Sequence, residues 1–375
     1  MGEAHTGLEL RSTVTSGGEL KLDLAEVTLD APGPDEVIVR IEASPINPSD
    51  LGLLLGPADL STLQAGGTAD RPTLTATIPP QRMGMMKPRL DQSMPVGNEG
   101  AGTVVDAGAN VAHLLGKKVG MIGGAMYAQY RKLPGRDCIV LPGGATAADG
   151  ASMFVNPLTA LGFVETMRAE GHKAIVHTAA ASNLGQMLNK ICLADGVPLV
   201  NIVRSEAQAA ILRAIGATHI VDSTAPDFMA TLTDAIAETG ATLGFDAIGG
   251  GKLAGQVLTA MEAAANRNAA SYSRYGSTTF KQVYIYGALD FGPTVLDRAF
   301  GMSWSIGGWL LTPFLMKAGQ ETMMRLRQRV ADELTTTFAS HYSATISLAD
   351  ALRPEIVDAY QRKTTGEKYL IDPSR

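Results

Sequence analysis

The chain has 375 residues, of which 45% are hydrophobic and 18% charged, a composition that excludes a disordered chain and supplies apolar residues for about two domain cores. The formal net charge of −6 excludes the basic surface typical of nucleic-acid-binding proteins. The apolar run 306–316 contains Pro313 and is too short to span a membrane. Because Cys138 and Cys192 cannot form a disulfide framework, we expect a reducing, cytoplasmic setting.

Short stretches of alternating apolar and polar residues dominate the sequence up to about residue 150. The stretches 36–43, 102–105 and 118–122 have the two-residue period of half-buried strands. We therefore predict a β-rich first domain. The long polar stretch 56–95, rich in Met and Pro, breaks this pattern, and we expect it to be either a surface loop or a lid over a site.

Strand and helix signals alternate from about residue 151. The predicted helices cover 151–167, 184–194, 206–215 and 228–239, and the predicted strands cover 174–178, 198–203, 217–222, 244–248 and 282–287. Such alternation favours right-handed crossovers and a parallel sheet. A second insertion, 263–279, is expected to be a loop or a lid like the first.

The end of the chain is expected to return to the first domain. An amphipathic helix is predicted at 320–337, and strand-like stretches follow at 342–347 and 368–372. We therefore predict one domain from residues 1–151 with 339–375, and a second domain from residues 152–338.

The loop from His177 to Gly185 joins the first predicted strand of the second domain directly to a helix. Backbone N–H groups at such a helix start favour a pyrophosphate. The G-x-G-x-x-G pattern of dinucleotide-binding loops is present in a degenerate form, with small residues at Ala180 and Ser182 and a true glycine at Gly185. The alternative is an ordinary strand-to-helix turn capped by Ser182 or Asn183.

The second strand of this domain ends at Arg204 and Ser205. A site that prefers NAD would have Asp or Glu here to bind the ribose hydroxyls, whereas a guanidinium and a hydroxyl suit a 2′-phosphate. The sequence therefore predicts NADPH as the cofactor. The alternative is that Arg204 is a solvated loop cation.

Seven short motifs occur in order along the chain, at 46–50, 97–102, 123–130, 156–160, 180–185, 245–250 and 365–368. In these motifs the sequence resembles the zinc-free medium-chain dehydrogenases/reductases, in the branch of the quinone oxidoreductases and enoyl-thioester reductases. The resemblance implies an α/β fold, with a GroES-like β lobe built from both chain ends and a Rossmann domain with a doubly wound parallel sheet. It also implies NADPH as the cofactor and a homodimer formed through the Rossmann domains.

The resemblance further implies which residues form the site. Asn47 and Asn156 would lie around the nicotinamide and would orient or polarise the reactants. The other implied cofactor-binding residues are Thr159, Ser182, Asn183, Leu184, Gly185, Arg204, Ser205, Gly249, Tyr286, Gly287, Ala288, Leu289 and Lys368.

The metal-ligand positions of the zinc-dependent relatives fall on Asn47, Asn98 and Asn156 in this chain. Amides are poor zinc ligands, so we expect no metal. Without a Lewis acid, alcohol oxidation is disfavoured, and hydride transfer from NADPH to a small apolar conjugated acceptor, a quinone or an α,β-unsaturated carbonyl, is favoured. His177 is expected to be a buried histidine and not a catalytic base.

Two departures from the family leave alternatives open. Many relatives have a tyrosine just after N-P-x-D, where this chain reads Leu51 to Gly56, and Tyr272 or Tyr275 could substitute for it. One alternative is an enoyl-thioester reductase, for which the cluster of Arg82, Lys87 and Arg89 would meet the acyl carrier. The other is a non-catalytic NADPH-binding sensor, which the degenerate glycine loop and the missing tyrosine would suit.

Overall fold

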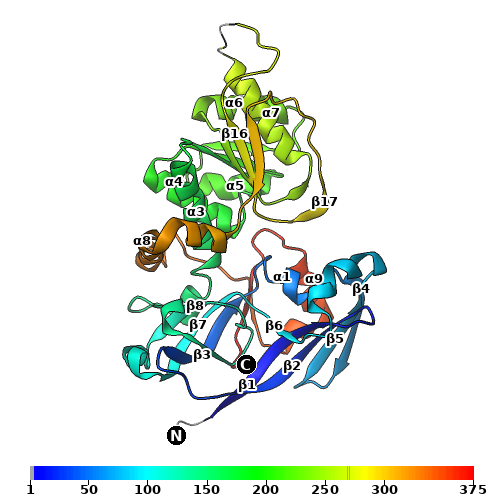
Figure 1. Ribbon diagram of the computed structural model, residues 1–375, viewed down its shortest axis with the longest axis vertical. Coiled ribbons are helices and arrows are strands. Elements are labelled where there is room, and N and C mark those ends of the chain that lie inside the picture. The colour runs from blue at the N-terminus through cyan, green and yellow to red at the C-terminus, as the bar shows by residue number, and fades with distance from the viewer. Residues whose placement is uncertain (1–3, 268, 270) are drawn as a thin grey trace. The chain divides into compact units, whose positions relative to one another are not determined.

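The computed structural model describes residues 4–375 except 268 and 270, and the chain divides into two compact units. The terminal unit comprises Met1–Val155 and Arg329–Arg375, and the central unit comprises Asn156–Gln328 (Figure 1). The domain boundaries predicted from the sequence, after residues 151 and 338, stay a prediction. In the described part of the chain, no helix has the length and apolar character needed to cross a membrane.

Five strands of the described residues form the first sheet of the terminal unit, in the order β4-β5-β2-β1-β6, with antiparallel pairs. They are β1 (His5–Val14), β2 (Glu19–Leu29), β4 (Asp59–Gly67), β5 (Pro72–Thr77) and β6 (Met94–Pro95). In β2, buried Leu20, Leu22 and Leu24 alternate with more exposed residues, which is the pattern of a strand with one face on a core.

The first insertion is not the irregular loop that the sequence suggests. Residues 59–77 form the hairpin β4–β5, which extends the sheet next to β2, and the 3-10 helix η1 (Pro80–Arg89) follows. The turn depends on Gly67, because its φ is +74° and a Cβ there would meet Arg71 O at 2.2 Å. The expectation of a loop or lid is therefore wrong for the hairpin.

The second sheet of the terminal unit combines both ends of the chain. Its described strands have the order β10-β8-β7-β3-β20-β19, and β9 also pairs with β3. They are β3 (Glu36–Pro45), β7 (Glu99–Ala107), β8 (Lys118–Ile122), β9 (Tyr130–Pro134), β10 (Cys138–Val140), β19 (Ala344–Ile346) and β20 (Tyr369–Ile371). Leu370 pairs with Pro45, so the C-terminal strand joins β3 as the sequence predicts.

Short helices complete the terminal unit. They are α1 (Leu51–Leu54), η2 (Ala109–Leu114), η3 (Gly135–Asp137), α2 (Ala147–Gly150), η4 (Asp350–Leu352) and α9 (Pro354–Gln361). Leu51 and Leu54 of α1 and Val357 of α9 are buried in the same apolar cluster as the inward leucines of β2. This cluster anchors the turn between β3 and α1, which carries Asn47.

The central unit has the predicted parallel sheet. Its described strands have the order β13-β12-β11-β14-β16-β18, and every pair is parallel. They are β11 (Ile175–His177), β12 (Leu199–Val203), β13 (His219–Asp222), β14 (Leu243–Asp246), β16 (Lys281–Ile285) and β18 (Trp304–Gly308). The chain winds from β11 to β12 and β13 on one side and to β14, β16 and β18 on the other. The prediction of a doubly wound sheet is confirmed.

Helices alternate with these strands. They are α3 (Val155–Ala169), α4 (Asn183–Asp195), α5 (Glu206–Ala214), α6 (Phe228–Thr239), α7 (Leu253–Asn266) and α8 (Leu311–Asp332), and the last is interrupted at Gly319. Figure 1 shows α6 and α7 side by side, and both contribute to one buried apolar cluster with the sheet. Two short strands, β15 (Gly249–Gly251) and β17 (Asp290–Thr294), pair outside the main sheet.

An aromatic layer joins α3 to the sheet. His177, Phe245 and Tyr284 are partners in register on β11, β14 and β16, so their side chains lie on the same face. Phe163 of α3 stacks on Phe245, with ring centroids 3.9 Å apart, and Trp309 meets Phe163 edge-on at 4.8 Å. This packing fixes α3 against β14, and Phe163 also lies 5.9 Å, centroid to centroid, from His177 of β11, the strand that leads into the His177–Gly185 loop.

A buried ion pair holds the base of the second insertion. Glu262 of α7 and Lys281 at the start of β16 are both buried, and the Nζ–Oε2 distance is 2.6 Å. Glu262 also accepts hydrogen bonds from Asn266 and Ser277. Burial alone would raise the pKa of Glu262, but the hydrogen bonds from Lys281 and Ser277 outweigh it and lower the pKa to about 2.

Removing the cation of this pair should destabilise the central unit. In Lys281→Met, Glu262 keeps its buried charge without its partner, so we expect the free energy of unfolding at pH 7 to fall by about 3–5 kcal/mol, measured by urea unfolding. The double variant Glu262→Gln/Lys281→Met should recover most of this loss, because the neutral amide introduced at position 262 can keep the bonds to Asn266 and Ser277. Equal losses in both variants would contradict the assigned role.

The same pair gives an acid dependence with a definite sign. Because the folded-state pKa of Glu262 is about 2 and the ordinary value is 4.5, its contribution is present above pH 4.5 and is lost as the pH falls towards 2. The wild type should therefore lose more stability over this range than the double variant does.

Candidate cofactor site

The carboxyl ends of the parallel strands meet at one edge of the central sheet. The chain leaves β11 and β14 in opposite directions, so their following loops diverge at this edge, where doubly wound sheets bind ligands. The loop after β11 runs from Thr178 to Ser182 and enters α4 directly. Ser182 is the N-cap residue of α4, and its Oγ accepts a hydrogen bond from the N–H of Gly185 at 3.1 Å. The two interpretations of this segment, a capped strand-to-helix turn and a nucleotide-binding loop, therefore describe the same backbone structure.

Close packing explains why this loop keeps a glycine in its last position. A Cβ on Gly185 would lie 2.1 Å from the carbonyl oxygen of Ala180, so α4 can approach the loop this closely only with glycine there. Ala179 has a φ of +51°, the left-handed conformation that costs a non-glycine residue about 1–2 kcal/mol. The loop therefore stores backbone strain at the predicted pyrophosphate position.

Asp246 connects the loops at the ends of β11 and β14. It is buried, and its Oδ1 accepts a hydrogen bond from Thr178 Oγ1 at 2.8 Å. The other carboxylate oxygen accepts from the N–H of Gly249 at 3.1 Å, and Thr178 Oγ1 also accepts from the N–H of Ala247. One carboxylate thereby positions Gly249 relative to the loop after β11. Sequence reasoning did not identify this function of Asp246.

The predicted residues Tyr286 to Leu289 follow β16 at the same edge. Backbone N–H groups of Tyr286 and Leu289 donate to the carbonyls of Asp246 and Ala247, which fixes this segment beside the loop after β14. The Tyr286 hydroxyl lies 2.7 Å from Nε2 of His177. Gly287 is half-buried, and Ala288 and Leu289 are exposed.

His177 is buried, as the sequence predicts. Burial lowers the pKa of His177 to about 3, so the ring is neutral at physiological pH. The ring stacks on Tyr286 and packs near Phe163. Its Nδ1 has no hydrogen-bond partner in the described part of the chain.

Arg204 and Ser205 lie at the carboxyl end of β12. Ser205 caps α5, and its Oγ accepts from the N–H of Gln208 at 3.3 Å. The N–H of Arg204 donates to the Gln208 side chain, and the Arg204 side chain is exposed. Among the residues that the structure describes, no carboxylate forms an ion pair with Arg204, whereas Arg213 of α5 pairs with Glu206.

The first turn of α3 carries Asn156 and Thr159. Because a short connection joins the end of α3 to the start of β11, the first turn of α3 lies toward the carboxyl edge of the sheet. Asn156 is half-buried and Thr159 is buried. The central unit thus brings together at one edge the predicted residues Asn156, Thr159, Ser182, Asn183, Leu184, Gly185, Arg204, Ser205, Gly249, Tyr286, Gly287, Ala288 and Leu289.

The two remaining predicted residues, Asn47 and Lys368, belong to a polar network in the terminal unit, in which Asn47 is buried and Lys368 is half-buried. The Asn47 side chain donates through Nδ2 to Oε1 of Glu99 at 2.8 Å, and the Asn47 N–H donates to Asp50. The ammonium of Lys368 donates to Ser152 Oγ at 2.8 Å. Ser152 Oγ in turn lies 2.8 Å from the Tyr342 hydroxyl. Glu99, Ser152 and Tyr342 are not among the site residues predicted from the sequence, although Glu99 lies within the motif at 97–102.

Burial shifts the pKa values of the ionisable groups in this network. It raises the pKa of Asp50 to about 7, although N–H groups of Asn47 and Asn98 donate to the carboxylate and favour ionisation. It lowers the pKa of Lys368 to about 8, against the attraction of Glu99 and Asp50. Both groups therefore titrate near physiological pH.

Two interpretations of the insertions are corrected by the structure. Tyr272 and Tyr275 lie between α7 and the start of β16, at the amino edge of the sheet and opposite the loops described above, and they are 92% and 60% exposed. These two tyrosines are therefore not at the edge of the central sheet that carries the Gly185 loop, and they do not substitute there for the tyrosine that follows N-P-x-D in many relatives. Arg89 is also unavailable to an acyl carrier, because its guanidinium donates to Leu53 O and to Ser12.

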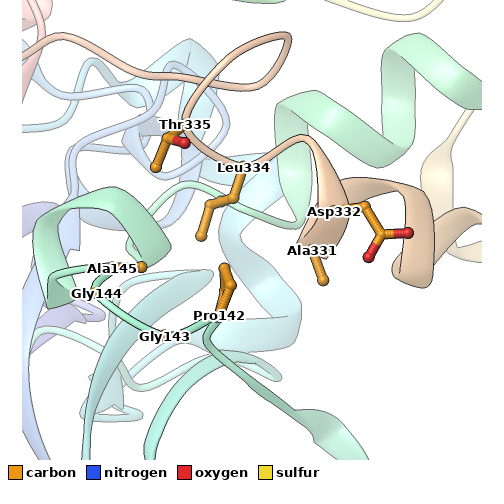
Figure 2. Close-up of a pocket in the computed structure, with 8 residues that line it drawn as sticks. All are labelled: Pro142, Gly143, Gly144, Ala145, Ala331, Asp332, Leu334 and Thr335. Atoms are coloured by element: carbon orange, nitrogen blue, oxygen red, sulfur yellow. The ribbon is translucent and has the colours of Figure 1, made fainter.

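A hollow of about 330 Å³ in the terminal unit does not coincide with any predicted site residue. Figure 2 shows it between the loop from Pro142 to Ala145 and the segment from Ala331 to Thr335, with Leu334 directed between them. Within the described residues, no group of three or more His, Cys, Asp or Glu side chains is placed to hold a metal ion.

Comparisons with known proteins agree with this architecture. No model of a protein family matches the chain. A mitochondrial enoyl-[acyl-carrier-protein] reductase from Xenopus tropicalis is 28% identical over 211 residues, which cover 53% of this chain and 51% of the relative. The structure of a candidate NADPH:quinone reductase from Mesorhizobium loti is 25% identical, with a TM-score of 0.72 over 100% of this chain and 99% of that chain. A quinone oxidoreductase from Escherichia coli, solved in complex with NADPH, is 17% identical, with a TM-score of 0.70 over 98% of this chain and 100% of that chain.

The chain is similar to these quinone and enoyl reductases. The resemblance predicted from the seven motifs is therefore confirmed. So is the predicted α/β fold, with a β lobe from both chain ends and a doubly wound parallel sheet. The matches cover about half or less of the length of the first curated relatives.

Proposed function

We propose that this protein is an NADPH-dependent oxidoreductase that transfers hydride, without a metal, to a small apolar conjugated acceptor, a quinone or an α,β-unsaturated carbonyl. The observation that carries the proposal is the exposed Arg204 at the end of β12, with no described carboxylate paired to it, at the same sheet edge as the Gly185 loop. A phosphate at this edge would meet both a cation and a helix start. The Escherichia coli relative solved with NADPH supports the choice of cofactor.

The residues at this edge fit a phosphorylated dinucleotide. The first turn of α4 offers backbone N–H groups to a pyrophosphate, and the closeness of Gly185 to Ala180 leaves the loop without a projecting side chain at that point. Arg204 would hold the 2′-phosphate, and Asp246 keeps Gly249 in place beside the loop. When bound, NADPH would supply the hydride. The neutral His177 ring holds the Tyr286 hydroxyl and so orders the segment after β16.

An enoyl-thioester reductase is the second candidate, because curated relatives carry that name. Quinone and enoyl reduction share hydride addition to a conjugated carbonyl system. The basic cluster expected to meet an acyl carrier is weakened, because Arg89 is bonded within the protein and Arg82 donates to the carbonyl of Pro57. The free quinone or enone therefore remains the first choice.

Replacing Arg204 should weaken NADPH much more than NADH. In Arg204→Gln, the charge-assisted bonds to the 2′-phosphate are lost, and we expect the Kd for NADPH to rise by about 10- to 100-fold while that for NADH changes by less than about threefold. Titration of nicotinamide fluorescence measures both constants. Arg213→Gln, which removes an arginine of the following helix α5 that is paired with Glu206, is the matched control and should change neither Kd. Equal losses of NADPH and NADH in Arg204→Gln would refute the 2′-phosphate role.

The acceptor is tested by following NADPH oxidation by its absorbance with 1,4-benzoquinone, a simple enone and crotonyl-CoA. We expect turnover with the quinone or the enone to exceed that with crotonyl-CoA. Faster turnover of crotonyl-CoA would favour the enoyl-thioester reductase. Tight NADPH binding without oxidation by any of the three would favour a non-catalytic sensor.

We also propose that the protein forms a homodimer through the central unit. β18 ends the described sheet, and an edge strand offers unpaired backbone groups to another strand. Apolar side chains near this strand in sequence are exposed, among them Met302 and Leu310. Light scattering on the protein as it elutes from a size-exclusion column should give about twice the chain mass of 39.3 kDa. A mass equal to that of one chain would contradict the dimer.

A further inference from the structure

Two buried asparagines join α4 to β12 in the central unit. Asn189 is 2% exposed and Asn201 is fully buried. The Nδ2 of Asn189 donates to Oδ1 of Asn201 at 2.6 Å, and the Nδ2 of Asn201 donates back to Oδ1 of Asn189 at 3.0 Å. Each NH₂ group also donates to a backbone carbonyl, Asn189 to Gly185 O at 3.1 Å and Asn201 to His219 O at 3.3 Å. Both hydrogens of each amide are therefore used within the protein.

Stability alone does not explain a pair of amides at this position. Burying two amides has a desolvation cost that their hydrogen bonds offset, and replacing both partners by apolar side chains of similar shape can be nearly neutral. Apolar contacts tolerate sliding, whereas a hydrogen bond acts over a narrow range of distance and angle. The reciprocal bonds of Asn189 and Asn201 therefore hold α4 and β12 in one relative position.

The pair lies between two elements of the proposed cofactor site. Asn189 is one helical turn after Gly185, so both residues are on the face of α4 that packs on the sheet. Asn201 is on β12, three residues before Arg204. The pair thus connects the helix whose first turn would bind the pyrophosphate to the strand whose end carries the cation for the 2′-phosphate.

A second connection between these elements lies at the loop after β11. The N–H of Ala180 donates to Ile202 O at 3.2 Å, and Gly185 packs closely against the Ala180 carbonyl. This contact alone would leave α4 able to tilt about its first turn. The side-chain bonds of Asn189 are four residues further along, about 6 Å along the helix axis. Two separated attachments fix the direction of α4 as well as its position.

We propose that Asn189 and Asn201 are positioning residues that set the spacing between the first turn of α4 and Arg204, and that this spacing determines the preference for NADPH over NADH. This inference rests on the proposed NADPH dependence. A ligand with a pyrophosphate and a 2′-phosphate gains fully from the second group only where both sites are already held at its own phosphate spacing. NADH has no 2′-phosphate, so its affinity depends less on that spacing.

The double variant Asn189→Leu/Asn201→Val removes the pair and leaves no side-chain amide unpaired. Leucine suits a helix and valine a strand, so we expect the Tm to stay within about 3 °C of the wild-type value. The Kd for NADPH, from nicotinamide fluorescence titration, should rise by about tenfold, and that for NADH by less than about threefold. Equal rises for both nucleotides, or no change in either, would overturn the proposal. If the leucine prevents folding, Asn189→Ala/Asn201→Val leaves more room and carries the same expectations.

Two fragments of the nucleotide separate the spacing from the phosphate sites themselves. Adenosine 2′-monophosphate has only the phosphate that Arg204 would hold, whereas adenosine 2′,5′-bisphosphate also has a phosphate at the start of the pyrophosphate. In calorimetric titrations, the double variant should lose about tenfold in affinity for the bisphosphate and less than about threefold for the monophosphate. Equal losses would place the effect at the Arg204 site and would overturn the proposal.

Combination with Arg204→Gln gives an independent check. If the pair acts through the spacing to Arg204, the two changes remove the same contribution and their effects are not additive. In the Arg204→Gln background, Asn189→Leu/Asn201→Val should therefore change the Kd for NADPH by less than about threefold. A further tenfold rise would show independent effects and would overturn the proposal.

Thr166→Val is the matched control, because it removes a buried hydrogen bond of the central unit, from Trp309 Nε1 to Thr166 Oγ1 at 3.0 Å, without touching α4 or β12. The Tm should fall, and the ratio of the Kd values for NADH and NADPH should not change. A change in that ratio as large as in the pair variant would overturn the specific role of the pair. If the wild type does not bind NADPH, the proposed function fails. If the wild type prefers NADPH and the pair variant keeps that preference, this inference alone fails.

Discussion

The central unit depends on the parallel pairing of β11 with both β12 and β14. This pairing sends the chain to opposite sides of the sheet after the two strands, so the loops that follow them diverge at one edge. Asp246 then ties the diverging loops together through Thr178 and the N–H of Gly249. The strand order separates these two loops, and the buried carboxylate of Asp246 holds them together.

The two units use charge in different ways. At the central edge the decisive charge is an exposed guanidinium, Arg204, with no carboxylate paired to it in the described residues, which suits a doubly charged phosphate from solvent. In the terminal unit, the carboxylates of Asp50 and Glu99 near Asn47 are buried, and Lys368 is half-buried. Burial moves the pKa of Asp50 up to about 7 and that of Lys368 down to about 8, and their attraction offsets part of the cost of desolvation. The main effect of this network is to fix the hydrogen-bonding geometry of its side chains.

The sequence predicts best those features that local periodicity encodes. The helix at 228–239 and the strand at 118–122 have the predicted bounds, because their apolar residues repeat with the helical and strand periods. The position of Gly185 is also predictable, since close approach of a helix to a loop excludes any side chain. Arg204 is predictable because the end of the second strand has a fixed place in this topology.

Features that depend on partners distant in sequence are not predictable in this way. The hairpin at 59–77 is polar and forms strands because it pairs beside β2. The ion pair of Glu262 and Lys281 joins residues 19 positions apart that carry no motif. The residue type alone allows Tyr272 or Tyr275 to substitute for the missing tyrosine, whereas the direction of α7 and β16 puts both at the opposite edge of the sheet.

The network around Asn47 shows why a motif alone does not give a residue's role. The side chain of Asn has both an NH₂ donor and a carbonyl acceptor, and the residues around it determine which way the amide is turned. Here the two carboxylates of the motifs have separate tasks. Asp50 accepts backbone N–H groups from Asn47 and Asn98 and so fixes the path of two chain segments, whereas Glu99 accepts the side-chain NH₂ group and so fixes the direction of the amide.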